Sequence, residues 1–148
     1  KGHRMSLNVA KTALVDTGYW YALLDQRDQH HPAAAKSSEA LLQFHYLIPW
    51  PVMYETLCTR FTRRPLAVRQ FETILKRPNA VRLDDSKYRD AALSLALDTV
   101  KPHPTSLSIV DSVLRLVIAD RSARVDCLFT FNPGDFRDVC VSRNVQII

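Results

Sequence analysis

Short apolar runs alternate with longer amphipathic segments along this chain, and the alternation predicts an α/β fold. The short runs are rich in branched and aromatic side chains, which is typical of buried strands. We expect strands at residues 13–15, 46–48, 81–83, 127–131 and 145–148. Because helical segments separate these strands, they should pair in parallel through right-handed crossovers.

Apolar positions at helical spacing predict helices at residues 17–24, 33–44, 51–63, 66–76, 86–100 and 109–121. Pro32 suits the first position of the second helix, whereas Pro65 and Pro78 end the third and fourth. No internal repeat or linker divides the chain. The pattern therefore predicts one domain over residues 5–148, with a central parallel sheet of about five short strands between helical layers.

Composition narrows the class of protein. The chain has 148 residues, of which 47% are hydrophobic and 24% are charged, as in an ordinary globular domain. No apolar run approaches the roughly 18 residues that a membrane span needs, and the N-terminus lacks a signal-peptide core. We expect a cytoplasmic protein without a membrane partner. Cys58, Cys127 and Cys140 are too few for a disulfide framework, and no CxxC pair indicates zinc.

The basic residues are unevenly distributed. The sequence "KGHR" before Met5 reads as a cloning remnant, and subtracting the charges of its Lys and Arg from the net +5 leaves +3. A cluster of arginines follows in "TRFTRRPLAVRQ": Arg60, Arg63, Arg64 and Arg69. Such a cluster is typical either of a solvated face or of a surface that contacts nucleic-acid phosphates.

Three carboxylates fall near the carboxyl ends of predicted strands or at the starts of helices, where an open α/β sheet binds ligands. Asp16 ends the first apolar run and is either a helix cap or a ligand. Glu55 lies near the start of the third helix, at the border of its apolar face, and suits the helix dipole. Asp111 completes a capping box with Ser108, yet it shares a face with core residues.

The turn "FTFNPGDF" adds Thr130, Asn132 and Asp135 to the same edge. Asn, Pro, Gly and Asp are ordinary turn residues, so the turn alone indicates little. Asp135 would, however, add a fourth carboxylate to the other three at this edge, and their like charges would repel one another unless a cation lay among them. Hard oxygen ligands without Cys or His favour Mg²⁺ or Mn²⁺, which suits hydrolysis of a phosphodiester by a metal-activated water.

The sequence resembles the PIN-domain family, in particular the toxin ribonucleases of bacterial VapBC toxin–antitoxin pairs. The resemblance rests on four ordered segments, which are "ALVDTGYWYALLDQRDQHHPAA", "WPVMYETLCTRF", "LSIVDSVLRLVIAD" and "LFTFNPGDF". It implies a three-layer α/β/α fold and a divalent-metal endoribonuclease that cleaves single-stranded RNA. A homodimer and a protein antitoxin whose tail covers the site are also implied.

The resemblance also assigns roles. Asp16, Glu55 and Asp111 match the family's acidic metal ligands, and Thr130 matches the hydroxyl residue that orders the site. The fourth acidic position is Asn132 here, which brings an oxygen but no charge, and Asp135 matches an accessory Asp that could also ligate. With such a site nearby, Arg60, Arg63 and Arg64 become candidate RNA-binding residues.

Asn132 leaves a second function open, namely a weakened PIN domain that binds RNA or a protein without cleaving. A nuclease acting on DNA or tRNA shares the chemistry and differs only in substrate. Several aromatic residues flank the expected site and are suited either to stacking on unpaired bases or to a core or dimer interface; they are Tyr19, Trp20, Tyr21, Trp50 and Tyr54.

Overall fold

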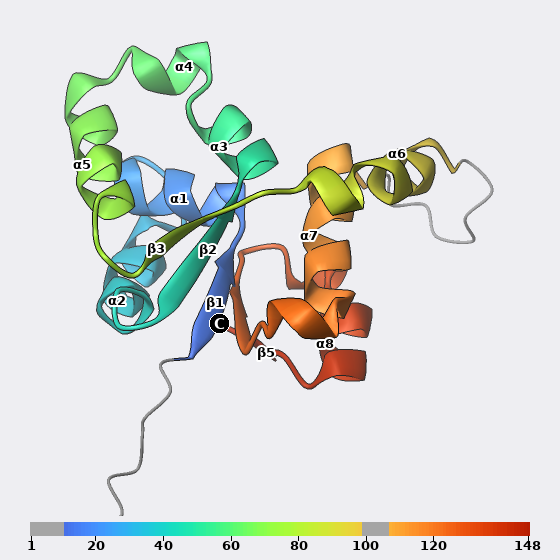
Figure 1. The fold of residues 1–148 in the computed structure, drawn as a ribbon. Helices are drawn as coiled ribbons and strands as arrows, with labels where there is room; N and C mark the ends of the chain where they lie inside the picture. The colour runs from blue at the N-terminus through green and yellow to red at the C-terminus, as the bar shows by residue number, and fades with distance from the viewer. Residues whose placement is uncertain (1–10, 99–106) are drawn as a thin grey trace, which may run out of the picture.

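The computed structural model describes residues 11–98 and 107–148, so the cloning remnant inferred at the N-terminus lies outside the described residues. A five-stranded parallel sheet has the order β3-β2-β1-β4-β5. Its strands are β1 (Thr12–Val15), β2 (His45–Pro49), β3 (Ala80–Leu83), β4 (Cys127–Phe129) and β5 (Gln146–Ile147). Helices cover both faces of the sheet (Figure 1). The predicted three-layer α/β/α fold is therefore confirmed.

The helices form two groups around the sheet (Figure 1). One side carries α1 (Thr17–Leu24), α2 (His31–Leu41) and α5 (Pro65–Leu75), and the other carries α7 (Ile109–Ala119) and α8 (Arg137–Arg143). After β2 come the short helices α3 (Trp50–Thr56) and α4 (Thr59–Thr62), and α6 (Arg89–Leu97) packs against α7. Three short 3-10 turns complete the described elements: η1 (Ser86–Tyr88), η2 (Arg121–Ala123) and η3 (Pro133–Asp135).

The central strand β1 explains why both faces of the sheet are covered. Its residues Ala13, Leu14 and Val15 have no exposed surface. Successive side chains of a strand point to opposite faces, so a strand buried throughout needs a helical layer on each side. The strand is therefore a rigid support, and the residue that follows it, Asp16, is held at a fixed place on the sheet edge.

The helix predicted over residues 51–63 is interrupted, which corrects the sequence interpretation. Helix α3 ends at Thr56, and Cys58 has an extended backbone with ψ 166° before α4 begins. The hydroxyl of Tyr21 donates a hydrogen bond to the carbonyl of Glu55 at 2.5 Å and lies 3.5 Å from that of Thr56. These carbonyls would accept the next helical N–H groups, so Tyr21 competes with continuation of the helix.

Other boundaries also differ from the prediction. β4 ends at Phe129 rather than at residue 131, because the Thr130 hydroxyl accepts a hydrogen bond from the Asn132 N–H and turns the chain. The predicted helix 86–100 is a 3-10 turn followed by α6, and its last two residues lie outside the described part of the chain. The second helix begins at His31 and ends at Leu41.

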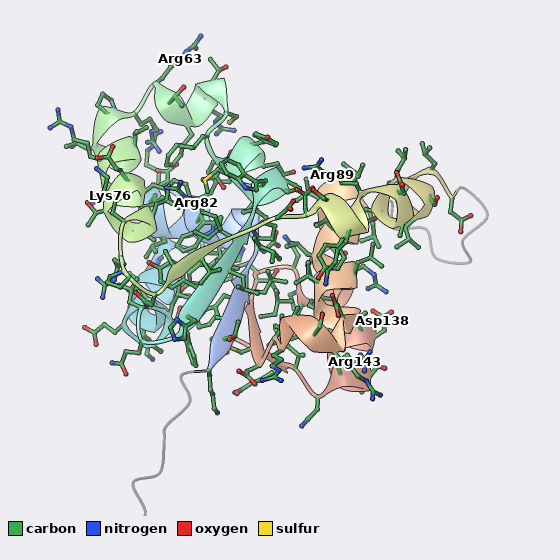
Figure 2. The ribbon with its side chains drawn as sticks, viewed as in Figure 1. Arg63, Lys76, Arg82, Arg89, Asp138 and Arg143 are labelled. Atoms are coloured by element: carbon green, nitrogen blue, oxygen red, sulfur yellow. The ribbon has the colours of Figure 1, made fainter. Side chains whose placement is uncertain are left out.

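Helix α8 was not predicted. Its seven residues give too short a hydrophobic pattern to separate from the neighbouring strand. Buried Cys140 anchors the helix, and the bidentate ion pair of Asp138 with Arg115 holds it against α7. Asp138 and Arg143 both project from this helix in Figure 2. Within residues 11–98 and 107–148, no helix is both long enough and apolar enough to cross a membrane.

Candidate metal centre at the sheet edge

The strand register brings Asp16 and Thr130 together. Val15 of β1 pairs with Phe129 of β4, so the next residue on each strand lies at the same edge. The Thr130 hydroxyl donates a hydrogen bond to Oδ2 of Asp16 at 2.9 Å, and both side chains are buried. Two neighbouring strands therefore fix this carboxylate, and Thr130 acts on it as a positioning residue.

Asp16 occupies the N-cap position of α1, but its side chain makes no capping hydrogen bond. The pKa of Asp16 is raised to about 6, mainly because the side chain is buried. The charges of Asp111 and Glu55 contribute to this rise, whereas hydrogen bonds from the Thr130 hydroxyl and the Thr17 backbone N–H oppose it. An ionised Asp16 is thus costly in the absence of a cation. The interpretation of Asp16 as a simple helix cap does not account for this geometry.

Glu55 reaches the same edge from α3. Its Oε1 accepts a hydrogen bond from the Thr17 hydroxyl at 2.6 Å, and its carbonyl accepts the bond from Tyr21. Thr17 was not assigned to the site from sequence, and Tyr21 was named only as an aromatic residue flanking it. Their spacing of one helical turn, directly after Asp16, is the signal that could have identified them, because it places both on one face of α1.

The capping box predicted at α7 is present. The Ser108 hydroxyl accepts from the Asp111 N–H at 3.1 Å, and Oδ2 of Asp111 accepts from the Ser108 N–H at 3.2 Å. Because this helix begins at the same sheet edge, Asp111 caps the helix and also lines the cavity described below. The structural and functional interpretations of Asp111 are therefore compatible.

The turn after β4 is fixed on two sides. Phe131 stacks on Tyr19, with 5.6 Å between ring centroids, and on His30, with 4.4 Å between centroids. The Arg115 guanidinium donates to the carbonyl of Asp135 at 2.7 Å. Burial raises the pKa of Asp135, and the nearby Asp111 charge adds to this effect.

One cavity of about 370 Å³ lies at this edge of the sheet. Its lining comprises Asp16, Thr17, Gly18, Tyr21, Glu55, Ser108, Asp111, Asn132 and Asp135. Four carboxylates, one amide and no His or Cys form a donor set that fits Mg²⁺ or Mn²⁺. Among the described residues, however, no three His, Cys, Asp or Glu side chains converge closely enough to form a metal-binding group as they stand. Glu55 and Asp111 instead accept the local hydrogen bonds described above.

Two of the three arginines expected to bind RNA line a cavity. Arg60 and Arg64 line a second cavity next to the first. Arg63 ends α4 and extends outward from the protein (Figure 2). Arg63 is not part of the lining of that cavity, and the assignment of the three arginines to RNA binding stays a prediction.

Replacing Thr130 with valine should lower the free energy of unfolding by about 2 kcal/mol. The change removes the donor to Asp16 and the acceptor of the Asn132 N–H while keeping the volume of the side chain. Thr130→Ser keeps both hydrogen bonds and is the matched control. Urea unfolding of the three proteins measures the effect, and equal midpoints for valine and wild type would contradict the assigned role.

The raised pKa of Asp16 predicts a pH dependence in the metal-free protein. The folded state binds this proton up to about pH 6, whereas the ordinary value is 3.8. Because the folded state binds the Asp16 proton more tightly than the unfolded state, this proton stabilises the fold. The stabilisation is therefore complete below pH 3.8 and is lost as the pH rises through 6. Unfolding in EDTA at pH 4 and pH 7 should show wild type losing on the order of 3 kcal/mol relative to Asp16→Asn. Parallel pH profiles would argue against a buried carboxylate.

No protein-family model matches the sequence, and no curated protein matches it. Among solved structures, the chain is similar to VapC20 from Mycobacterium tuberculosis, described as a sarcin-ricin loop cleaving toxin. The TM-score is 0.66 at 18% sequence identity, and the match covers 85% of this chain and 94% of the other. With its five-stranded parallel sheet between two helical layers, the chain has the fold of a VapC toxin, the three-layer α/β/α architecture of PIN domains.

Proposed function

We propose that this protein is a divalent-metal-dependent endoribonuclease that hydrolyses phosphodiester bonds of RNA, and that it is the toxin of a toxin–antitoxin pair. One observation carries the proposal: carboxylates from four separate parts of the chain line a single cavity at the sheet edge. The fold shared with a toxin that cleaves the sarcin-ricin loop supports the same conclusion. Because its substrate is RNA, we place its action in the cytoplasm.

Asp16, Glu55 and Asp111 would hold Mg²⁺ or Mn²⁺, directly or through water, with Asp135 as a further ligand. When bound, the metal lowers the pKa of a coordinated water and stabilises charge on the phosphoryl oxygens. The chain's own groups prepare this site. Thr130 fixes Asp16, the Thr17 hydroxyl holds Glu55, and the Asn132 side chain offers an uncharged oxygen beside them.

Cleavage assays test the proposal. Purified protein with Mn²⁺ should cut single-stranded RNA, and EDTA should stop the reaction because the carboxylates need the cation. Single-stranded DNA of the same sequence serves as the comparison that separates an RNase from a DNase. RNA that stays intact at stoichiometric enzyme with Mn²⁺ present would reject the nuclease assignment.

A second candidate function is a PIN-like domain that binds RNA or a protein without cleaving. Asn132 favours it, because an amide replaces a charge in the cavity and weakens its hold on a metal. RNA binding without Mn²⁺ binding would support this candidate over the first.

The proposal includes a homodimer and a cognate antitoxin as partners. Exposed apolar side chains near the site support an interface with another protein surface. Trp50 and Tyr54 on α3 have their rings 6.1 Å apart, and Leu93 and Ile109 line a small apolar cavity nearby. Sedimentation of the isolated chain measures whether it forms a dimer.

A further inference from the structure

A second cavity adjoins the proposed metal centre. It has a volume of about 410 Å³, within the range of small-ligand sites. Its lining comes from α1, the loop after α1, α4 and the residues that flank α4, and consists of Tyr21, Asp25, Arg27, Asp28, Cys58, Arg60, Phe61 and Arg64. Because Tyr21 lines both cavities, a molecule in this one touches a side chain that also faces the carboxylates.

Most charges in this cavity are already paired. Asp25 forms ion pairs with Arg64 at 2.9 Å and with Arg27 at 3.5 Å. The Arg60 side chain is exposed, and in the part of the chain that the structure describes its guanidinium makes no ion pair. The cavity therefore presents one cation that is available to an anionic ligand.

The cavity also presents one available carboxylate. Oδ1 of Asp28 accepts a hydrogen bond from the His30 N–H at 2.8 Å. Its Oδ2 has no hydrogen-bond partner within residues 11–98 and 107–148. An ionised carboxylate only accepts hydrogen bonds, so this oxygen would repel a phosphate and attract an N–H group. The ligand must therefore carry an anion at one end and N–H donors at the other.

Aromatic surface also lines this cavity. The Tyr21 ring packs edge-on against the buried Phe61, with ring centroids 5.9 Å apart. Its hydroxyl is held by the Glu55 carbonyl and lies 3.2 Å from the Cys58 sulfur. A ring fixed in this way offers a stacking surface at little entropic cost.

We propose that this second cavity binds the nucleotide next to the cleaved bond, with its phosphate on Arg60, its base against Tyr21, and an N–H of the base on Asp28. A nucleotide combines the anion, the flat ring and the N–H donors that the lining requires. Shared Tyr21 places this nucleotide beside the phosphodiester bond in the metal centre. The inference rests on the proposed function and adds a subsite that positions the strand.

Binding measured in EDTA separates this subsite from the chemistry, because no metal is available for cleavage. The probe is a fluorescein-labelled single-stranded RNA oligonucleotide, and the readout is fluorescence anisotropy. Arg60→Ala should raise Kd about fivefold and lower the slope of log Kd against log salt by about 0.7, the value for one lost phosphate contact. Arg121→Ala is the control, since it removes the same charge from the exposed turn η2 after the far end of α7.

Asp28→Asn tests the recognition of the base. The amide replaces an acceptor with a group that also donates, so the preference among the four nucleotides at the position next to the cut should change. Arg60→Ala should leave that preference as in wild type, because a phosphate contact carries no base information. Cleavage of a randomised oligonucleotide pool with Mn²⁺, followed by sequencing of the products, measures both preferences.

The outcomes distinguish this subsite from the nuclease assignment. If Arg60→Ala weakens RNA binding and Arg121→Ala does not, the subsite is supported even when the wild-type protein fails to cleave. A failure to cleave would then reject only the nuclease assignment. An unchanged Kd, or equal weakening by Arg121→Ala, overturns the subsite whether or not RNA is cut. An unchanged base preference in Asp28→Asn overturns the role given to that carboxylate.

Discussion

Asp16→Asn is expected to lower kcat/KM for RNA cleavage by about 10³-fold, which corresponds to about 4 kcal/mol of lost transition-state stabilisation. Asn keeps the shape of the side chain and can still accept the hydrogen bond from Thr130. It loses the negative charge through which Asp16 would hold the metal. The loss should therefore appear in catalysis and metal binding rather than in folding.

A matched control separates this effect from a general loss of charge. Glu39→Gln removes a carboxylate from the exposed side of α2, outside the metal-centre cavity, and should cleave as wild type does. Initial rates with Mn²⁺ and thermal unfolding of both variants provide the comparison. If the Asp16 variant retains more than about a tenth of wild-type activity, this carboxylate does not hold the metal.

Asn132→Asp should tighten Mn²⁺ binding by about tenfold or more, because it adds a charge to a cavity already lined by four carboxylates. Without a metal, the added charge is repelled by these carboxylates and should destabilise the protein. The gain in Mn²⁺ affinity and the loss of stability are therefore expected together. Calorimetric titration with Mn²⁺ and urea unfolding in EDTA measure the two effects.

Asn144→Asp provides the control for this substitution. Asn144 ends α8 in a left-handed conformation, with φ 55°, that aspartate also tolerates. It adds the same charge away from the cavity and should leave Mn²⁺ affinity unchanged. Equal affinities for Asn132→Asp and wild type would place Asn132 outside the metal's reach.

The sheet and its ligand edge could be predicted because they follow from local pattern. Buried runs such as residues 13–15 identify strands, and helical crossovers make the strands parallel. Parallel strands end at one edge, which is why Asp16 and Thr130 could be placed near each other before their hydrogen bond was known. The capping box of Ser108 and Asp111 depends on four consecutive residues and was equally predictable.

Interactions between α1 and α3 could not be predicted in this way. The bonds from Thr17 and Tyr21 to Glu55 join residues more than 30 positions apart, and they form only once both helices pack on the sheet. Interruption of the predicted helix at Cys58 has the same origin, since Tyr21 takes the carbonyl that the helix would use. Local sequence favours a continuous helix there, and tertiary contact overrides it.

The position of a bound metal tests the assignment of the sheet edge most directly. Crystals grown with Mn²⁺ and measured near its absorption edge should show an anomalous peak in the first cavity, contacted by oxygens of Asp16 and Asp111, and the same peak should be absent in Asp16→Asn. A peak elsewhere, or an empty cavity at a Mn²⁺ concentration that supports cleavage, would contradict the proposed metal centre.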